Sequence, residues 1–129
     1  MRAALSRYST IAQQTASPDR LMVMLFEAAC RHMESAAAQL DALDRKGAAV
    51  GIRKTQDIVQ ELLGTLNPAV QPELCAQLAD VYAFTLARLV KAQVSGEAQA
   101  VRDAHKVFAP VAQAFAQVVA HQEDSGRAA

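Results

Sequence analysis

The sequence contains little of what a β-sheet or a membrane span needs. Tryptophan is absent, aromatic residues make up 5% of the 129 residues, and runs of β-branched residues are missing. A sheet normally draws on those residue types. No stretch approaches the ~20 consecutive apolar residues that cross a bilayer, and the first ten residues lack the apolar centre of a signal peptide. We therefore expect an all-α protein in the cytoplasm that does not insert into membranes.

Charge of one sign is also lacking, because 13 basic residues balance 13 acidic ones and the formal net charge is zero. A protein that binds nucleic acid needs a clustered positive surface to displace counterions. The balance therefore argues against nucleic acid as a partner, and equally against an anionic membrane surface.

Cysteine is scarce, with Cys30 and Cys75 far apart in the sequence and each inside an apolar helical pattern. Such residues usually behave as small buried hydrophobic groups in a reducing compartment. We expect two free thiols rather than a disulfide.

What the sequence does contain is alanine and regularly spaced apolar residues, and hydrophobic residues reach 52%. Helix signals divide the chain: Ser17 and Pro18 favour a helix start, and Pro72 and the glycine-containing corner at 95–97 separate the later segments. We expect helices over about 17–44, 48–66, 72–94 and 97–121, with Pro110 bending the last one.

Four long helices with short connections predict an antiparallel up-down four-helix bundle with a short N-terminal helical arm. The expected organisation is a mobile arm over 1–16, the bundle over 17–122 and a frayed tail over 123–129.

The helix expected at 17–44 has two apolar stripes, whereas a bundle helix needs one for its own core. The second stripe contains Met22, Phe26 and Met33, and the next helix is widened by Ile58 and Leu63. One interpretation is a wider core. The other is a groove that accepts an amphipathic helix from another chain, which the arm residues Leu5, Tyr8 and Ile11 would cover in the free protein.

No group of residues has the spacing that catalysis or metal binding requires. The three histidines have no second ligand at helical metal spacing, and motifs for phosphate binding or nucleophilic catalysis are absent. His32 and His105 lie on or beside apolar stripes, where a partly buried, hydrogen-bonded histidine is the usual role. We expect no enzyme activity and no cofactor.

Three runs, in order, resemble the FliS family of flagellin export chaperones. Tyr8 followed by ASPDRLMVMLFEAA (16–29) is similar to the family's opening pattern of tyrosine, spacer and Ser-Pro-x-x-Leu. IRKTQDIVQELLGTLNP (52–68) and LADVYAFTLARLVKAQ (78–93) resemble its second and third signatures. The resemblance extends from residue 8 to about 115.

The resemblance implies a cytoplasmic chaperone that binds the C-terminal segment of monomeric flagellin, prevents premature polymerisation and helps deliver subunits to the flagellar type III export apparatus. Matched positions imply the following partner-binding residues: Tyr8, Ile52, Gln56, Ile58, Leu62, Leu66, Tyr82, Leu89, Ala92 and Gln93. For Leu62 and Leu66 the residues themselves favour a core role, and for Tyr82 the core edge is an equal alternative.

Two other functions are compatible with the same residues. A self-associating structural bundle would use the extra apolar stripe as a homodimer interface. An export chaperone for another flagellar axial protein would bind a different amphipathic segment.

Overall fold

The computed structural model describes residues 17–128, so the expected arm at 1–16, with Leu5, Tyr8 and Ile11, lies outside the described residues. Helix α2 spans Pro18–Asp41. It begins as expected, because the Ser17 hydroxyl accepts a hydrogen bond from the Arg20 backbone N–H at 3.1 Å, which satisfies a donor that the helix leaves unpaired.

Helix α3 spans Arg45–Gly64 and begins three residues before the expected start. Its cap is Asp44, whose carboxylate accepts a hydrogen bond from the Gly47 backbone N–H at 2.9 Å. The expected start of this helix at 48 was therefore too late. Residues 45–47 form the first turn of α3, and the reversal of the chain occurs at Leu43, which adopts a left-handed φ of 62°.

Helix α4 spans Pro72–Ser95 and ends at Gly96, which has a φ of 75°. That conformation suits glycine. A Cβ at this position would lie 2.9 Å from the guanidinium carbon of Arg45, but that flexible side chain can move, so the backbone conformation is what favours glycine at this corner.

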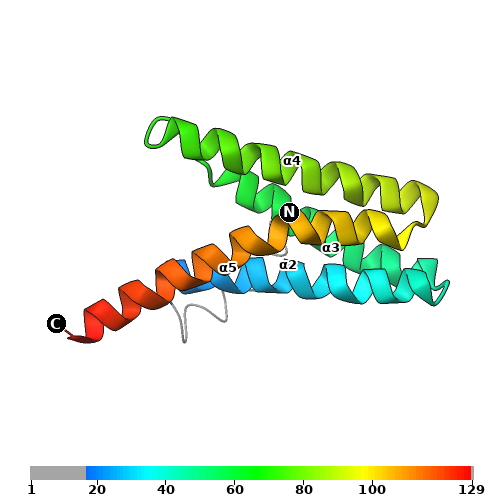
Figure 1. Ribbon diagram of the computed structural model, residues 1–129, viewed down its shortest axis with the longest axis horizontal. Helices are drawn as coiled ribbons and strands as arrows, with labels where there is room; N and C mark the ends of the chain where they lie inside the picture. The colour runs from blue at the N-terminus through cyan, green and yellow to red at the C-terminus, as the bar shows by residue number, and fades with distance from the viewer. Residues whose placement is uncertain (1–16, 129) are drawn as a thin grey trace.

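Helix α5 spans Ala98–Ala128 with Pro110 inside it. The expected end near 121 was too early, and residues 123–128, expected to be a frayed tail, are helical. Glu123 forms an ion pair with Arg20 at the start of α2, and this contact lies within the added turns. Pro110 is exposed, and the C-terminal half of α5 leans away from α4 (Figure 1).

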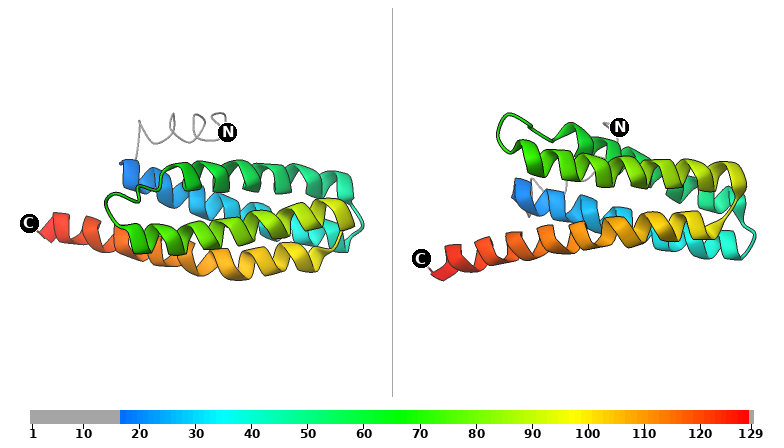
Figure 2. Two further views of the ribbon diagram at one scale, coloured as in Figure 1. Left: turned by 90° about the horizontal axis from the view of Figure 1, so that it is seen from above. Right: turned by 45° about the horizontal axis from the view of Figure 1, so that its top comes forward.

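The expectation of an all-helical chain is confirmed for the described residues, which contain four helices and no strand. The chain reverses direction at each connection, and the helices lie side by side in all three ribbon views (Figures 1 and 2). Helix α2 packs against α3 and α5, and α4 packs against the same two helices. The four helices therefore form a ring of four seams, in which the α2–α5 seam is opposite the α3–α4 seam.

Phe108 of α5 is fully buried at the centre of this ring. Its ring centroid lies 5.5 Å from that of Phe26 on α2 and 6.3 Å from that of Tyr82 on α4. The buried hydroxyls of Thr55 and Thr85 donate to backbone carbonyl oxygens one turn earlier, each at 2.8 Å, so the core contains no unpaired threonine hydroxyl.

The second apolar stripe of α2 is core rather than surplus surface. Phe26 and Met33 are buried, and so is Ile58 on α3, although Leu63 is exposed. Of the two interpretations given for this stripe, the buried residues therefore favour the wider core. A helix that packs against two neighbours needs two stripes, and α2 packs against both α3 and α5.

We expect Phe108→Ala to lower the free energy of unfolding by about 3–5 kcal/mol, because it removes a large buried ring and leaves a cavity among three helices. Urea denaturation followed by circular dichroism measures this. Val118→Ala on the exposed side of α5 serves as the control and should change stability little. Equal effects of the two substitutions would contradict a core centred on Phe108.

Candidate partner-binding surface

Helix α4 is apolar on more sides than its contacts use. Of its 24 residues, four are charged. One face packs into the core through Tyr82 and Leu89, yet Val90 and Val94 remain 50% and 77% exposed. A helix that is hydrophobic all round is normally buried on all sides, so α4 presents a face that its contacts within residues 17–128 leave exposed.

The exposed face of α4 is a continuous stripe. Its members lie four, three and four residues apart, the spacing of one helix face. They are Ala83, Ala87, Val90 and Val94, all exposed. The sequence did not predict this stripe as a binding surface and pointed instead to the helices expected at 17–44 and 48–66. The low charge of 72–95 was a signal that could have identified it.

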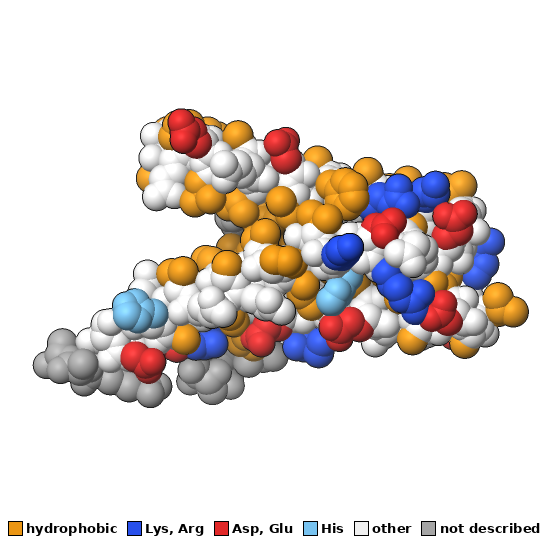
Figure 3. All heavy atoms as spheres, viewed as in Figure 1, with side chains coloured by type: hydrophobic (Ala, Val, Ile, Leu, Met, Phe, Trp, Pro, Cys, Tyr) orange, Lys and Arg blue, Asp and Glu red, His pale blue; other side chains and the backbone are white. Residues whose placement is uncertain are grey.

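A cleft opens beside α4 at one end of the bundle. Figure 3 shows the first half of α4 standing apart from the second half of α5, with hydrophobic side chains on both walls. The larger apolar residues of these two segments that keep accessible surface are Leu74, Leu78, Val81, Phe115 and Val118. Phe115 packs in a tilted arrangement against Phe26, with ring centroids 5.3 Å apart. This contact joins the second half of α5 to the core.

A second hollow lies between the end of α3 and the start of α4. Its lining is almost entirely apolar and includes Leu63, Leu66, Cys75, Ala76 and Ala79. The small alanine side chains leave room between the two helices here. The hollow and the cleft therefore border the first half of α4 on opposite sides.

The other end of the α3–α4 seam is closed by polar contacts. The side-chain amides of Gln56 and Gln93 form a reciprocal pair, with nitrogen-to-oxygen distances of 3.0 and 3.1 Å. Arg45 donates to the carbonyl oxygens of Gln93 and Val94, where its charge favours the C-terminal end of α4.

The residues proposed from the sequence as partner-binding residues divide into two groups. Six of them are at most 2% exposed and belong to the core: Ile52, Ile58, Leu62, Tyr82, Leu89 and Ala92. Leu66 lines the hollow, and Gln56 and Gln93 pair across the seam. Tyr8 lies outside the described residues. The structure thus brings both glutamines and Leu66 to the α3–α4 seam, and leaves the other six beneath the surface.

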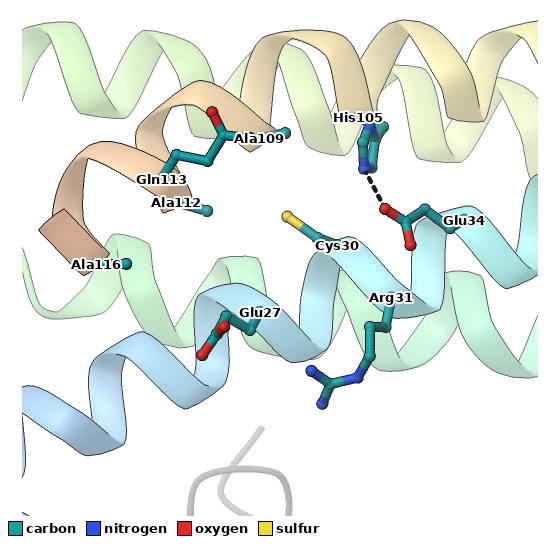
Figure 4. A pocket seen from close by; sticks show the side chains of 9 residues that line it. All are labelled: Glu27, Cys30, Arg31, Glu34, His105, Ala109, Ala112, Gln113 and Ala116. Carbon is teal, nitrogen blue, oxygen red and sulfur yellow. Dashed lines mark hydrogen bonds and ion pairs between the residues drawn. The ribbon is translucent and has the colours of Figure 1, made fainter.

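The opposite seam, between α2 and α5, is polar and tied by charges. Figure 4 shows the hollow there, with Glu34 facing His105, whose Nε2 lies 3.1 Å from the carboxylate oxygen. Arg102 pairs with Asp41 along the same seam. Its hydrogen bond holds the pKa of the Asp41 carboxyl below the usual range. The expectation of a partly buried, hydrogen-bonded His105 is confirmed.

Neither a membrane span nor a metal centre emerges from residues 17–128. Within that range no helix is long and apolar enough to cross a bilayer. The same residues contain no group of three or more His, Cys, Asp or Glu side chains placed to hold a metal ion.

Comparison with known proteins agrees with the three sequence runs. The model of the family described as "FliS: Flagellar protein FliS" matches residues 1–122. The chain belongs to the FliS family. The "Flagellar secretion chaperone FliS" of Bacillus subtilis (strain 168) is 30% identical over 90 residues, which are 70% of this chain and 66% of that protein. The match thus spans just under two thirds of the relative's own length.

Cys30 of this FliS-family chain points into the α2–α5 hollow (Figure 4). Both cysteines are free thiols, as expected. Partial burial, together with the nearby carboxylates of Glu34 and Glu27, raises the pKa of the Cys30 thiol to about 11. Because the thiolate is the reactive form, this cysteine is a protonated thiol of low reactivity at neutral pH.

We expect the alkylation rate of Cys30 in a Cys75→Ala variant to keep rising with pH beyond 11, because the thiolate fraction is one half at the pKa of about 11 and levels off only above it. Iodoacetamide labelling followed by mass spectrometry measures the rate. The same variant unfolded in urea is the control, and its rate should level off at a lower pH, about one to two units above the ordinary thiol pKa of about 8.5. A plateau of the folded protein at the same pH as this control, with circular dichroism unchanged, would contradict the burial of this thiol.

Proposed function

We propose that this chain is a cytoplasmic export chaperone that binds the C-terminal segment of monomeric flagellin, prevents its premature polymerisation and aids its delivery to the flagellar type III export apparatus. Membership of the FliS family and the printed name of the Bacillus relative support a chaperone role in flagellar export. The structural observation that carries the proposal is the uncovered apolar face of α4.

The shape of that face suits an extended helical client. With a rise of 1.5 Å per residue, the 24 residues of α4 extend over roughly 36 Å. An amphipathic helix binds such a surface through apolar residues spaced three and four apart. The exposed valines, the cleft toward α5 and the hollow toward α3 together offer apolar contacts along much of α4.

The energetics suit a chaperone that must release its client. A flagellin segment that folds as it binds would lose much of the gain from apolar burial to the cost of ordering its own chain. The net affinity is then modest even for a large buried area. The proposed activity needs holding and release, and requires no catalytic group.

The paired glutamines are the polar residues best placed to contact the client. Gln56 and Gln93 satisfy each other in the free protein, and each amide has both donors and acceptors. A client segment that leaves the helical conformation at this point presents unpaired backbone N–H and C=O groups. The two amides can then exchange their mutual hydrogen bonds for hydrogen bonds to that backbone. The six buried residues then act indirectly, by packing in the core beneath the helices that carry the binding surface.

We expect the flagellin C-terminal segment from the same genome to bind saturably, one to one, with a negative heat-capacity change, because binding buries apolar surface. Isothermal titration calorimetry at several temperatures measures this. An absence of heat at every temperature would contradict the proposal. A tight homodimer in analytical ultracentrifugation that ignores the segment would favour the self-associating bundle, and selective binding of another axial protein's segment would favour a different client.

We expect Val90→Asp to weaken binding of that segment by about ten-fold, because an apolar client would bury an unpaired carboxylate. The matched control is Val50→Asp on α3, since Val50 is 52% exposed and Val90 is 50% exposed. Calorimetry should show near-normal binding by the control, with unchanged melting temperatures for both variants. Equal weakening by both would argue against α4 as the binding surface.

A further inference from the structure

The zero net charge of the chain conceals an uneven distribution of charge along it. Residues 55–87 contain four acidic side chains, Asp57, Glu61, Glu73 and Asp80, and no lysine, arginine or histidine. This segment comprises the second half of α3, the α3–α4 connection and the first half of α4. Its negative charge is balanced only by residues elsewhere in the chain.

The acidic segment coincides with the open end of the bundle. Figure 3 shows acidic side chains over the first half of α4, above the cleft, while basic side chains gather toward the other end of that helix. At that closed end the first half of α3 contains Arg45, Lys46, Arg53 and Lys54, and the second half of α4 contains Arg88 and Lys91. Helices α3 and α4 are therefore each polarised along their length.

The exposed acidic side chains of α4 at the open end are not neutralised by ion pairs within residues 17–128. Glu73 and Asp80 are exposed, and in the described part of the chain neither belongs to an ion pair. On the facing second half of α5, Glu123 is already paired with Arg20. The charge of Glu73 is stabilised by its place in the first turn of α4, but Asp80 lies in the middle of the helix and has no such compensation.

Carboxylates of one sign beside an apolar cleft define the chemistry of a complementary ligand. Apolar walls provide affinity for an apolar face, while the surrounding negative potential attracts cations and repels anions. We propose that the open end of the bundle binds one amphipathic client helix whose apolar stripe is flanked by lysine or arginine side chains. This inference rests on the proposed function and specifies which chemical class of client segment the cleft takes.

In this arrangement the apolar stripe of the client lies in the cleft between the first half of α4 and the second half of α5 (Figure 3). Basic side chains at the edge of that stripe pair with Glu73 and Asp80. The charges also set the direction of the client, because its basic side chains are repelled from the closed end and attracted to the open end.

We expect two designed helical peptides with the same apolar stripe to bind differently, the lysine-flanked one about ten-fold more tightly than the glutamate-flanked one at low salt. The preference should shrink as salt rises from about 0.01 to 1 M, where the screening length falls from about 30 to about 3 Å. Fluorescence anisotropy measures both. A lysine-bearing peptide without the stripe is the control for unspecific attraction and should not bind. Equal affinities of the two striped peptides would overturn the inference.

Neutralising variants locate the interaction. We expect Glu73→Gln and Asp80→Asn each to weaken binding of the lysine-flanked peptide by about three-fold, the range of exposed ion pairs. Glu97→Gln at the closed end is the control and should change little. If the control weakens binding as much as the other two, the site is not at the open end.

Failure of the inference can be distinguished from failure of the proposed function. If the flagellin segment binds with no dependence on salt or on Glu73 and Asp80, the charge inference is wrong and the proposed function remains. If the lysine-flanked peptide binds as expected but the flagellin segment does not, the cleft takes basic amphipathic helices and flagellin is not the client.

Discussion

The packing around Phe108 is the constraint on which the rest of the structure depends. Its ring contacts Phe26 on α2 and Tyr82 on α4, so a single buried side chain of α5 joins three of the four helices. Because close-packed cores tolerate little change of volume, the spacing of the helices is set at this level. Beyond it, toward the C-terminal end of α5, the helices are free to diverge, and α4 and α5 separate there (Figure 1).

The two opposite seams α2–α5 and α3–α4 are held by different kinds of interaction. Ion pairs tie α2 to α5 at several levels, from Arg20 with Glu123 to Arg102 with Asp41. The α3–α4 seam is held instead by neutral amides and by alanines that leave a hollow. Exposed ion pairs add little stability. Their charged side chains nevertheless occupy the surface of the α2–α5 seam, so this seam offers less apolar surface to a partner. The surface suited to a partner is therefore on the α4 side of the ring, opposite the charged seam.

Much of the fold was predictable because the relevant signals are local. Ser17 and Pro18 start α2 as the sequence indicates, and Pro72 and Gly96 bound α4, since each of these residues acts through its own backbone or a neighbouring N–H group. Boundaries that depend on distant contacts were predicted less well. The last turns of α5 contain Glu123, whose partner Arg20 is 103 positions away in the sequence, and no local pattern indicates that contact.

The candidate site was predicted only in part, for a similar reason. Periodicity identified the apolar faces of the helices but could not tell a core face from an open one, so Phe26 and Ile58 were assigned to a possible groove and Val90 was overlooked. By itself the sequence determined the helical class, most helix boundaries, the free thiols and the family, because these follow from local chemistry and ordered motifs. Only the tertiary structure decided which apolar faces are buried, because burial depends on which neighbours each helix receives, and α4 receives too few to cover all its sides.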